Sequence, residues 1–124
     1  QYCQTLQKMP DLLPLASTSN AILEQNLPTE SMVRFKLFLA SSLQEYGLLL
    51  EKKFPTLAKG EGAGLLLRTY SLTLGLWQSL NYPSALVNAL SPEIVKVLKR
   101  NFDYELTLAV TQIWIGCLSQ QKAT

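Results

Sequence analysis

The sequence predicts an all-α fold, a helical bundle of about five to seven helices in a single domain. No segment alternates apolar and polar residues with strand-like turn signals, whereas long stretches place apolar residues three and four positions apart. At 124 residues the chain is long enough to bury roughly two-thirds of its unfolded surface. We therefore expect one all-helical domain covering residues 1–124.

The first helix is predicted over residues 1–8, where apolar side chains recur at helical spacing. Gln1 rather than Met opens the chain, so we expect the beginning of this helix to lie in an absent upstream part. Pro10 ends the helix and Asp11 can cap the next one, which we expect to reach about residue 25. Its predicted inward face consists of Leu12, Leu15, Ala16, Ser19, Ile22 and Leu23.

A long amphipathic helix is predicted over residues 29–53, after a break at Pro28. We expect Thr29 to cap it and Glu30 to stand in its first turn, where a negative charge is favourable. Pro55 follows its end. The predicted buried stripe is Met32, Phe35, Leu39, Ser42, Leu43, Tyr46, Leu49 and Leu50.

Residues 62–80 predict a central helix that is too apolar to be exposed. Arg68 is the one charge in this stretch, and the next is Glu93. A broad arc of leucines, with Tyr70 and Trp77, faces one side of the helical wheel. The remaining stripe of small or uncharged residues is suited to close approach of another helix; it comprises Gly64, Ser71, Gly75, Gln78 and Ser79.

Short helical connectors are predicted over residues 84–90 and from Ser91 onward, and Asn101 is expected to cap a last helix reaching about residue 120. This last helix has two apolar faces. The first contains Phe102, Leu106, Ala109, Val110, Ile113 and Cys117. The second contains Tyr104, Leu108, Ile115 and Leu118.

Composition argues against several classes of protein. Histidine is absent, which removes the usual general base and the commonest metal ligand, and no nucleophile has a matching base. Cys3 and Cys117 lack metal-ligand spacing, so we expect reduced thiols in the cytoplasm, no metal and no cofactor. A net charge of +2 is too small to predict nucleic-acid binding. We expect the chain not to be an enzyme.

Two further interpretations fail on sequence. The uncharged run over residues 69–92 is interrupted by Gln78, two asparagines and two prolines, so we do not expect a membrane span. The segment KGEGAG, residues 59–64, lacks the lysine and hydroxyl residue that end a phosphate-binding loop, and it follows a helix rather than a strand.

The central and last helices each carry more apolar surface than one small domain needs. We therefore expect them to pack against their symmetry mates in a four-helix bundle across a two-fold axis. The predicted interface consists of Gly64, Arg68, Ser71, Gly75, Gln78, Tyr104, Leu108, Thr111, Ile115 and Leu118. In the alternative, residues 84–100 cover these second faces within one chain.

Four segments together resemble the C-terminal regulatory domain of TetR/AcrR-family transcriptional regulators. They are ILEQNL (22–27), VRFKLFL (33–39), GEGAGLLLRTYSLTLGLWQ (60–78) and NFDYELTLAVTQIWIGCL (101–118). The resemblance implies an N-terminal helix-turn-helix domain, absent from this chain, and a homodimer formed by the last two long helices. DNA would be bound only through the missing domain.

The resemblance also implies a pocket for a small molecule whose binding shifts the linking helix, most simply in a repressor. A largely apolar site with a few hydroxyls suits a neutral or weakly polar hydrophobic effector. The implied lining is Met9, Leu12, Ser19, Phe35, Phe38, Leu39, Ser42, Tyr46, Tyr70 and Trp77. Two alternatives stay open. One is that these residues belong to an ordinary packed core, and the other is that the domain is a ligand-free protein-protein interaction module.

Overall fold

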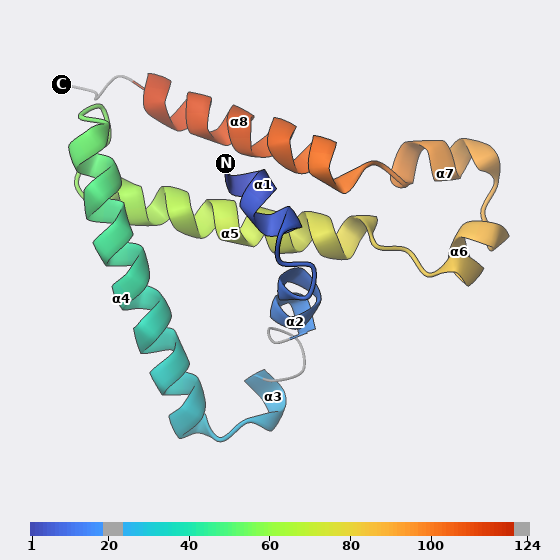
Figure 1. Ribbon diagram of the computed structural model, residues 1–124, viewed down its shortest axis with the longest axis horizontal. Helices are drawn as coiled ribbons and strands as arrows, with labels where there is room; N and C mark the ends of the chain where they lie inside the picture. The colour runs from blue at the N-terminus through green and yellow to red at the C-terminus, as the bar shows by residue number, and fades with distance from the viewer. Residues whose placement is uncertain (19–23, 121–124) are drawn as a thin grey trace.

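A central helix, α5 (Glu61–Leu80), is the element on which three other helices pack in the computed structural model, which describes residues 1–18 and 24–120 (Figure 1). These residues contain no strand, and the all-α prediction is confirmed. Their helices are α1 (Tyr2–Gln7), α2 (Leu12–Thr18), α3 (Glu24–Asn26), α4 (Thr29–Lys53), α5 (Glu61–Leu80), α6 (Ser84–Ala89), α7 (Pro92–Leu98) and α8 (Phe102–Ser119). Ser19, Ile22 and Leu23 of the predicted second helix lie outside the described residues.

The buried face of α5 is narrower and more polar than its leucines suggest. Leu65 is fully buried, Leu74 is nearly so, and Thr69 and Thr73 are buried one and two turns beyond Leu65. Helices α4, α8 and α2 all contact α5, and Leu106 of α8 is likewise fully buried. The core is therefore the set of contacts around α5.

Helices α4 and α5 cross with their backbones in direct contact at two glycines. A Cβ atom added to Gly62 would collide with the carbonyl oxygen of Gly47, and one added to Gly47 would collide with the backbone nitrogen of Ala63. Only glycine permits this approach. Neither glycine was predicted to lie at a contact between helices.

A carboxylate secures the turn between these helices. Glu51 Oε1 accepts hydrogen bonds from the amides of Gly60, at 2.7 Å, and Gly62, at 3.1 Å. Gly60 precedes α5 with a φ of 89°, a left-handed conformation that favours glycine. The bonded turn holds the first residues of α5 against α4.

The predicted caps have different outcomes. Asn101 caps α8 as expected, because its Oδ1 accepts a hydrogen bond of 2.9 Å from the amide of Tyr104. The prediction for Thr29 was wrong: Pro28 occupies the N-cap position of α4, and Thr29 is the first helical residue. Proline suits a helix start because its fixed φ and missing N–H cost nothing there.

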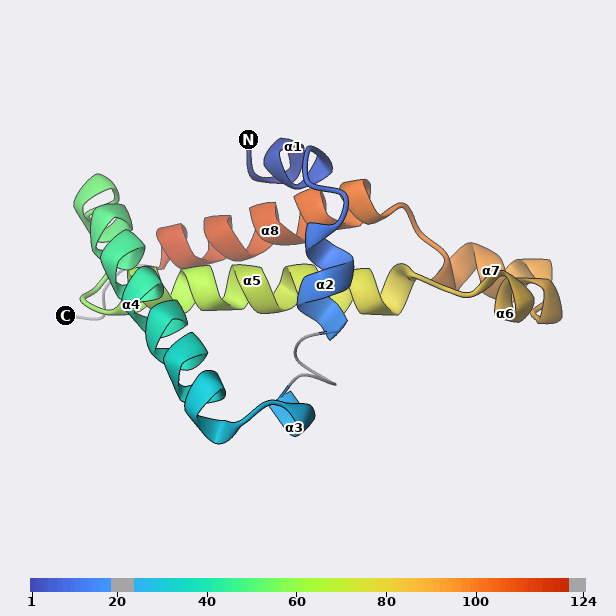
Figure 2. The same cartoon turned by 60° about the horizontal axis from the view of Figure 1, so that its bottom comes forward.

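On the predicted inward face of α2, the prediction for Leu12 was wrong, whereas Ala16 is half-buried. Leu13 is buried at 7% exposure, whereas Leu12 is 44% exposed. Helix α2 lies across α5 (Figure 2). A short helix that crosses its neighbour makes contact over little more than one turn, so its buried position depends on the crossing geometry and not on periodicity alone.

The predicted buried stripe of α4 is buried only in part. The one buried residue of α4 is Gly47, which is not in the stripe, and within the stripe Phe35, Tyr46 and Leu49 are 41%, 58% and 55% exposed. Helix α4 crosses α5 near its own C-terminal end, and its N-terminal half extends away from the bundle (Figures 1 and 2). Amphipathic spacing therefore overstated the burial.

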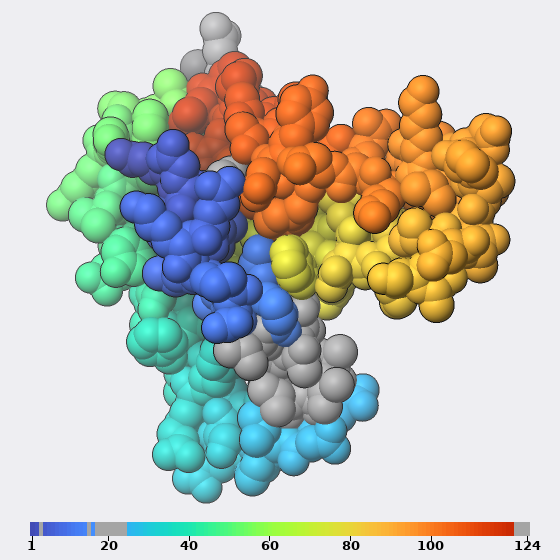
Figure 3. Space-filling view, turned by 45° about the vertical axis from the view of Figure 1, so that its right-hand side comes forward, coloured from blue at the N-terminus to red at the C-terminus, as the bar shows by residue number. Residues whose placement is uncertain are grey.

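Helices α6 and α7 form a separate arm at the end of α5 (Figures 1 and 3). Neither helix contains a buried residue, and Leu86, Ile94 and Val97 are 44%, 45% and 63% exposed. The arm therefore does not cover the second faces of α5 and α8, contrary to the monomeric alternative.

Among the helices of residues 1–18 and 24–120, none combines the length and the apolar character that a membrane span requires.

Candidate functional site

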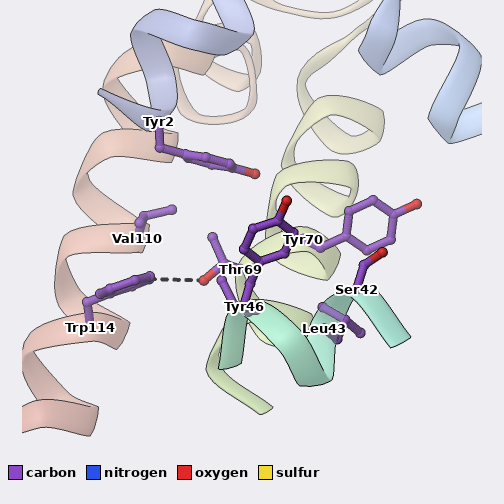
Figure 4. Close-up of a pocket in the computed structure, with 9 residues that line it drawn as sticks. Tyr2, Ser42, Leu43, Tyr46, Thr69, Tyr70, Val110 and Trp114 are labelled. Carbon is purple, nitrogen blue, oxygen red and sulfur yellow. Dashed lines mark hydrogen bonds between the residues drawn. The ribbon is translucent and has the colours of Figure 1, made fainter. Parts of the chain in front are cut away.

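A cavity of about 580 Å³ lies between α1, α4, α5 and α8, within the size range of small-molecule sites. Its lining is mostly aromatic and aliphatic, and none of the described lining residues is charged. It is lined by Tyr2, Ser42, Leu43, Tyr46, Leu66, Thr69, Tyr70, Val110 and Trp114 (Figure 4).

One wall of the cavity comes from α8 and is tied to α5. Trp114 and Val110 project from α8 toward α5 (Figure 4). The indole Nε1 of Trp114 donates a hydrogen bond of 3.0 Å to Oγ1 of Thr69, and that hydroxyl donates at 2.8 Å to the carbonyl oxygen of Leu65. The indole N–H is therefore already satisfied within the protein.

Tyr2 joins α1 to the same face of α5. Its hydroxyl lies 2.6 Å from Oγ1 of Thr73. The Thr73 hydroxyl donates its single hydrogen to the carbonyl oxygen of Thr69, at 2.7 Å, so Tyr2 is the donor in the bond to Thr73. Two successive threonines on α5 thus anchor α1 and α8.

Two tyrosines of the opposite wall have hydroxyls that are not bonded within the described part of the chain. Among the described residues, no hydrogen-bond partner lies within reach of the Tyr46 or Tyr70 hydroxyl, and burial is not complete for either residue. The Ser42 hydroxyl donates to the carbonyl oxygen of Phe38 at 2.9 Å and keeps lone pairs for accepting. The surface that these residues present to the cavity is nevertheless almost wholly apolar.

Three of the ten predicted pocket residues line the cavity: Ser42, Tyr46 and Tyr70. Leu39 is half-buried on α4, while Phe35 and Phe38 are exposed farther along that helix. Leu12 is exposed on α2, and Ser19 lies outside the described residues. The cavity lining therefore does not include Leu12, Phe35, Phe38 or Leu39.

Met9 and Trp77 line a second hollow of about 220 Å³, where α1 and α2 meet α5 and α8. Trp77 packs edge-on against Phe102, with ring centroids 5.2 Å apart and planes at 88°. Such a pair stabilises the junction of two helices. Met9 and Trp77 therefore sit apart from the larger cavity.

Sequence reasoning missed most of the cavity wall. Leu43, Leu66 and Val110 were expected on apolar faces, but an apolar face does not distinguish a cavity wall from packed core. Trp114 fell on neither predicted face of the last helix. The missed lining residues are Tyr2, Leu43, Leu66, Thr69, Val110 and Trp114.

With the geometry established, comparison with known proteins identifies the family. A family model described as the tetracyclin repressor-like C-terminal domain matches residues 2–121. The chain belongs to this family. No curated protein and no solved structure matches the chain.

Membership of the tetracyclin repressor-like family assigns a general role. Domains of this family are parts of transcriptional regulators, which are not enzymes, and they typically dimerise and bind small ligands. The family resemblance of the four sequence segments is confirmed. The chain is therefore the C-terminal domain of a transcriptional regulator, a kind of domain that in general serves effector binding and dimerisation.

The predicted interface residues of this tetracyclin repressor-like domain lie mainly on open surface. On α8, Tyr104 and Ile115 are 65% and 62% exposed, and Leu108 and Thr111 are also exposed, whereas Leu118 is half-buried. On α5 the exposed members are Arg68, Ser71, Gly75 and Gln78, and Gly64 is half-buried. Leu67, which was not predicted, is 46% exposed between Gly64 and Ser71 on the same stripe.

Proposed function

We propose that this chain is the effector-binding and dimerisation domain of a TetR-like transcriptional repressor in the cytoplasm. A small hydrophobic ligand changes the spacing of the DNA-binding domains that precede α1 in a homodimer. The observation that carries the proposal is the position of Tyr2, which belongs to α1 and lines the cavity. A ligand in the cavity thus touches the helix that leads toward the upstream domain.

The proposed mechanism is a shift between two populations. In one, α1 is held on α5 by the bond from Tyr2 to Thr73. A ligand that packs against Tyr2 favours a different position of α1, and it can shift the equilibrium only by its difference in affinity for the two states. Repositioning of α1 in both subunits changes the distance between the DNA-binding domains and lowers operator affinity.

Dimerisation in this proposal uses the open faces of α5 and α8. Helices α5 and α8 contact each other and lie side by side (Figure 1). A Cβ atom at Gly75 would meet nothing within 4 Å inside one chain, so its small size is not needed for folding of the subunit. Together with exposed Leu67, Tyr104 and Ile115, this supports packing against a second copy.

Operator binding by the full-length protein tests the proposal. Trp114 borders the cavity, so its fluorescence can select binders from a panel of neutral lipophilic compounds. A saturating binder should lower operator affinity, measured by fluorescence anisotropy of labelled DNA. Unchanged operator affinity with the ligand bound would reject the mechanism.

A matched pair of valine substitutions controls for nonspecific effects. Val110→Trp fills the cavity, so it should abolish ligand binding and the response of operator affinity. Val97→Trp places the same side chain on α7, where Val97 is 63% exposed, and should leave both intact. If no compound binds or raises the melting temperature, the domain is instead a ligand-free interaction module.

A further inference from the structure

Polar side chains around the cavity donate their hydrogens to other groups of the protein. The Trp114 indole N–H is bonded to Thr69, and the Tyr2 hydroxyl donates to Thr73. The hydroxyls of Ser42 and Thr69 donate to carbonyl oxygens of their own helices, α4 and α5. These four donors are therefore already bonded within the subunit.

Carbon atoms form nearly all of the surface that the nine described lining residues present to the cavity. The hydroxyls of Tyr46 and Tyr70 therefore contribute little to that surface. Small-molecule sites commonly combine an apolar lining with a few polar groups that fix the orientation of the ligand. The described lining of this cavity presents almost no polar surface for that purpose.

A hydroxyl group enclosed by such a surface is unfavourable. It gives up its hydrogen bonds to water, and an apolar lining returns none of them. A bound water molecule is a poor substitute, because it needs about two to four polar partners of its own. A hydrocarbon group loses no hydrogen bond and is favoured by leaving water. The cavity should therefore discriminate between a hydrocarbon and its hydroxylated form.

We propose that the part of the effector enclosed by the cavity is pure hydrocarbon, and that the domain rejects compounds of the same shape that place a hydroxyl there. This inference rests on the proposed function. It narrows the ligand from hydrophobic compounds in general to those without a hydrogen-bonding group inside the cavity. The volume of about 580 Å³ is within the range of small-molecule sites.

Two rigid probes of similar shape test the class. They are 2,6-dimethylnaphthalene and 2,6-dihydroxynaphthalene, which differ only in having methyl or hydroxyl groups at opposite ends of one ring system. Because the diol is polar at both ends, its rings cannot enter the cavity without one hydroxyl. Binding of each radiolabelled probe to the full-length protein is measured by equilibrium dialysis at pH 7.

Partition of the same probes between octanol and water supplies the reference, because octanol can hydrogen-bond to a hydroxyl. We expect the ratio of the two dissociation constants to exceed the ratio of the two partition coefficients about tenfold or more, since the cavity lining offers no such bond. A ratio equal to or below the partition ratio would overturn the inference, and so would failure of 2,6-dimethylnaphthalene to bind.

Cavity-filling variants test where the hydrocarbon binds. Val110→Trp and Leu43→Trp fill the cavity from α8 and from α4, so each variant that keeps the wild-type circular dichroism spectrum should lose 2,6-dimethylnaphthalene binding. Val97→Trp is the matched control, because Val97 is 63% exposed on α7, and it should keep the wild-type affinity. Unchanged binding in a folded, filled variant would place the hydrocarbon elsewhere and overturn the inference.

Operator binding separates this inference from the proposed function. If 2,6-dimethylnaphthalene binds with the expected selectivity but leaves operator affinity unchanged, the ligand class is supported and the regulatory function is rejected. If the diol binds as well as its partition ratio allows and lowers operator affinity, the regulatory function is supported and the hydrocarbon class is rejected.

Discussion

The indole Nε1 of Trp114 donates a 3.0 Å hydrogen bond to Oγ1 of Thr69, across the contact between α8 and α5. Thr69 is buried at 5% exposure, and its hydroxyl donates a hydrogen bond to the Leu65 carbonyl oxygen within α5. The bond therefore fixes the two long helices relative to each other and places both residues in the wall of the cavity.

Thr69→Val should destabilise the protein by about 1–3 kcal/mol, because valine has nearly the same shape but leaves the Trp114 N–H without its acceptor. Urea denaturation monitored by circular dichroism measures the change. Thr5→Val is the control: its hydroxyl also bonds to a carbonyl of its own helix region, but it is exposed, so we expect a change within about 0.5 kcal/mol. Equal losses in the two variants would contradict the role given to Thr69.

Tyr2→Phe should loosen α1 without disturbing α5. The substitution removes the donor to Thr73 and keeps the ring. The free energy of local opening of α1 should fall by the contribution of one hydrogen bond. Amides of α1, such as those of Thr5 and Lys8, should therefore exchange with solvent about three- to tenfold faster. Hydrogen exchange measured by NMR tests this, with Tyr82→Phe as control. Unchanged exchange in α1 would show that the bond does not hold the helix.

Gly62→Ala and Gly116→Ala should have opposite effects. A Cβ at Gly62 collides with the Gly47 carbonyl, so α4 and α5 must separate, with a loss of about 1–3 kcal/mol or more. A Cβ at Gly116 meets nothing within 4 Å, so the higher helix propensity of alanine should stabilise the protein by up to about 1 kcal/mol. Urea midpoints report both. A neutral Gly62→Ala would be incompatible with the backbone contact.

Gly75→Leu should raise the dissociation constant of the proposed dimer at least about thirtyfold, equivalent to about 2 kcal/mol, while the subunit remains folded because position 75 is open within the chain. Sedimentation velocity over a concentration series measures this. Trp77→Ala should instead leave the dimer intact and lower stability by about 2–4 kcal/mol, because it removes the contact with Phe102. A wild-type dimer in Gly75→Leu would place the interface elsewhere.

The spacing of apolar residues, together with helix-breaking and capping residues, determined where the long helices begin and end in the sequence. Helix α4 spans Thr29–Lys53 as predicted, α5 begins one residue before the predicted start, and Asn101 caps α8. These features depend on neighbours within four residues, which the sequence displays directly. The open second faces of α5 and α8 were foreseen for the same reason.

Only the tertiary structure decided which helices meet and how closely. The contact of Gly47 with Gly62, the bond from Trp114 to Thr69 and the meeting of Tyr2 with Thr73 join residues 15, 45 and 71 positions apart. A helical wheel assigns a residue to a face but carries no information on the crossing angle or separation of two helices. Phe35 and Phe38 share the apolar character of the pocket residues yet lie outside the cavity, because α4 diverges from α5 before reaching them.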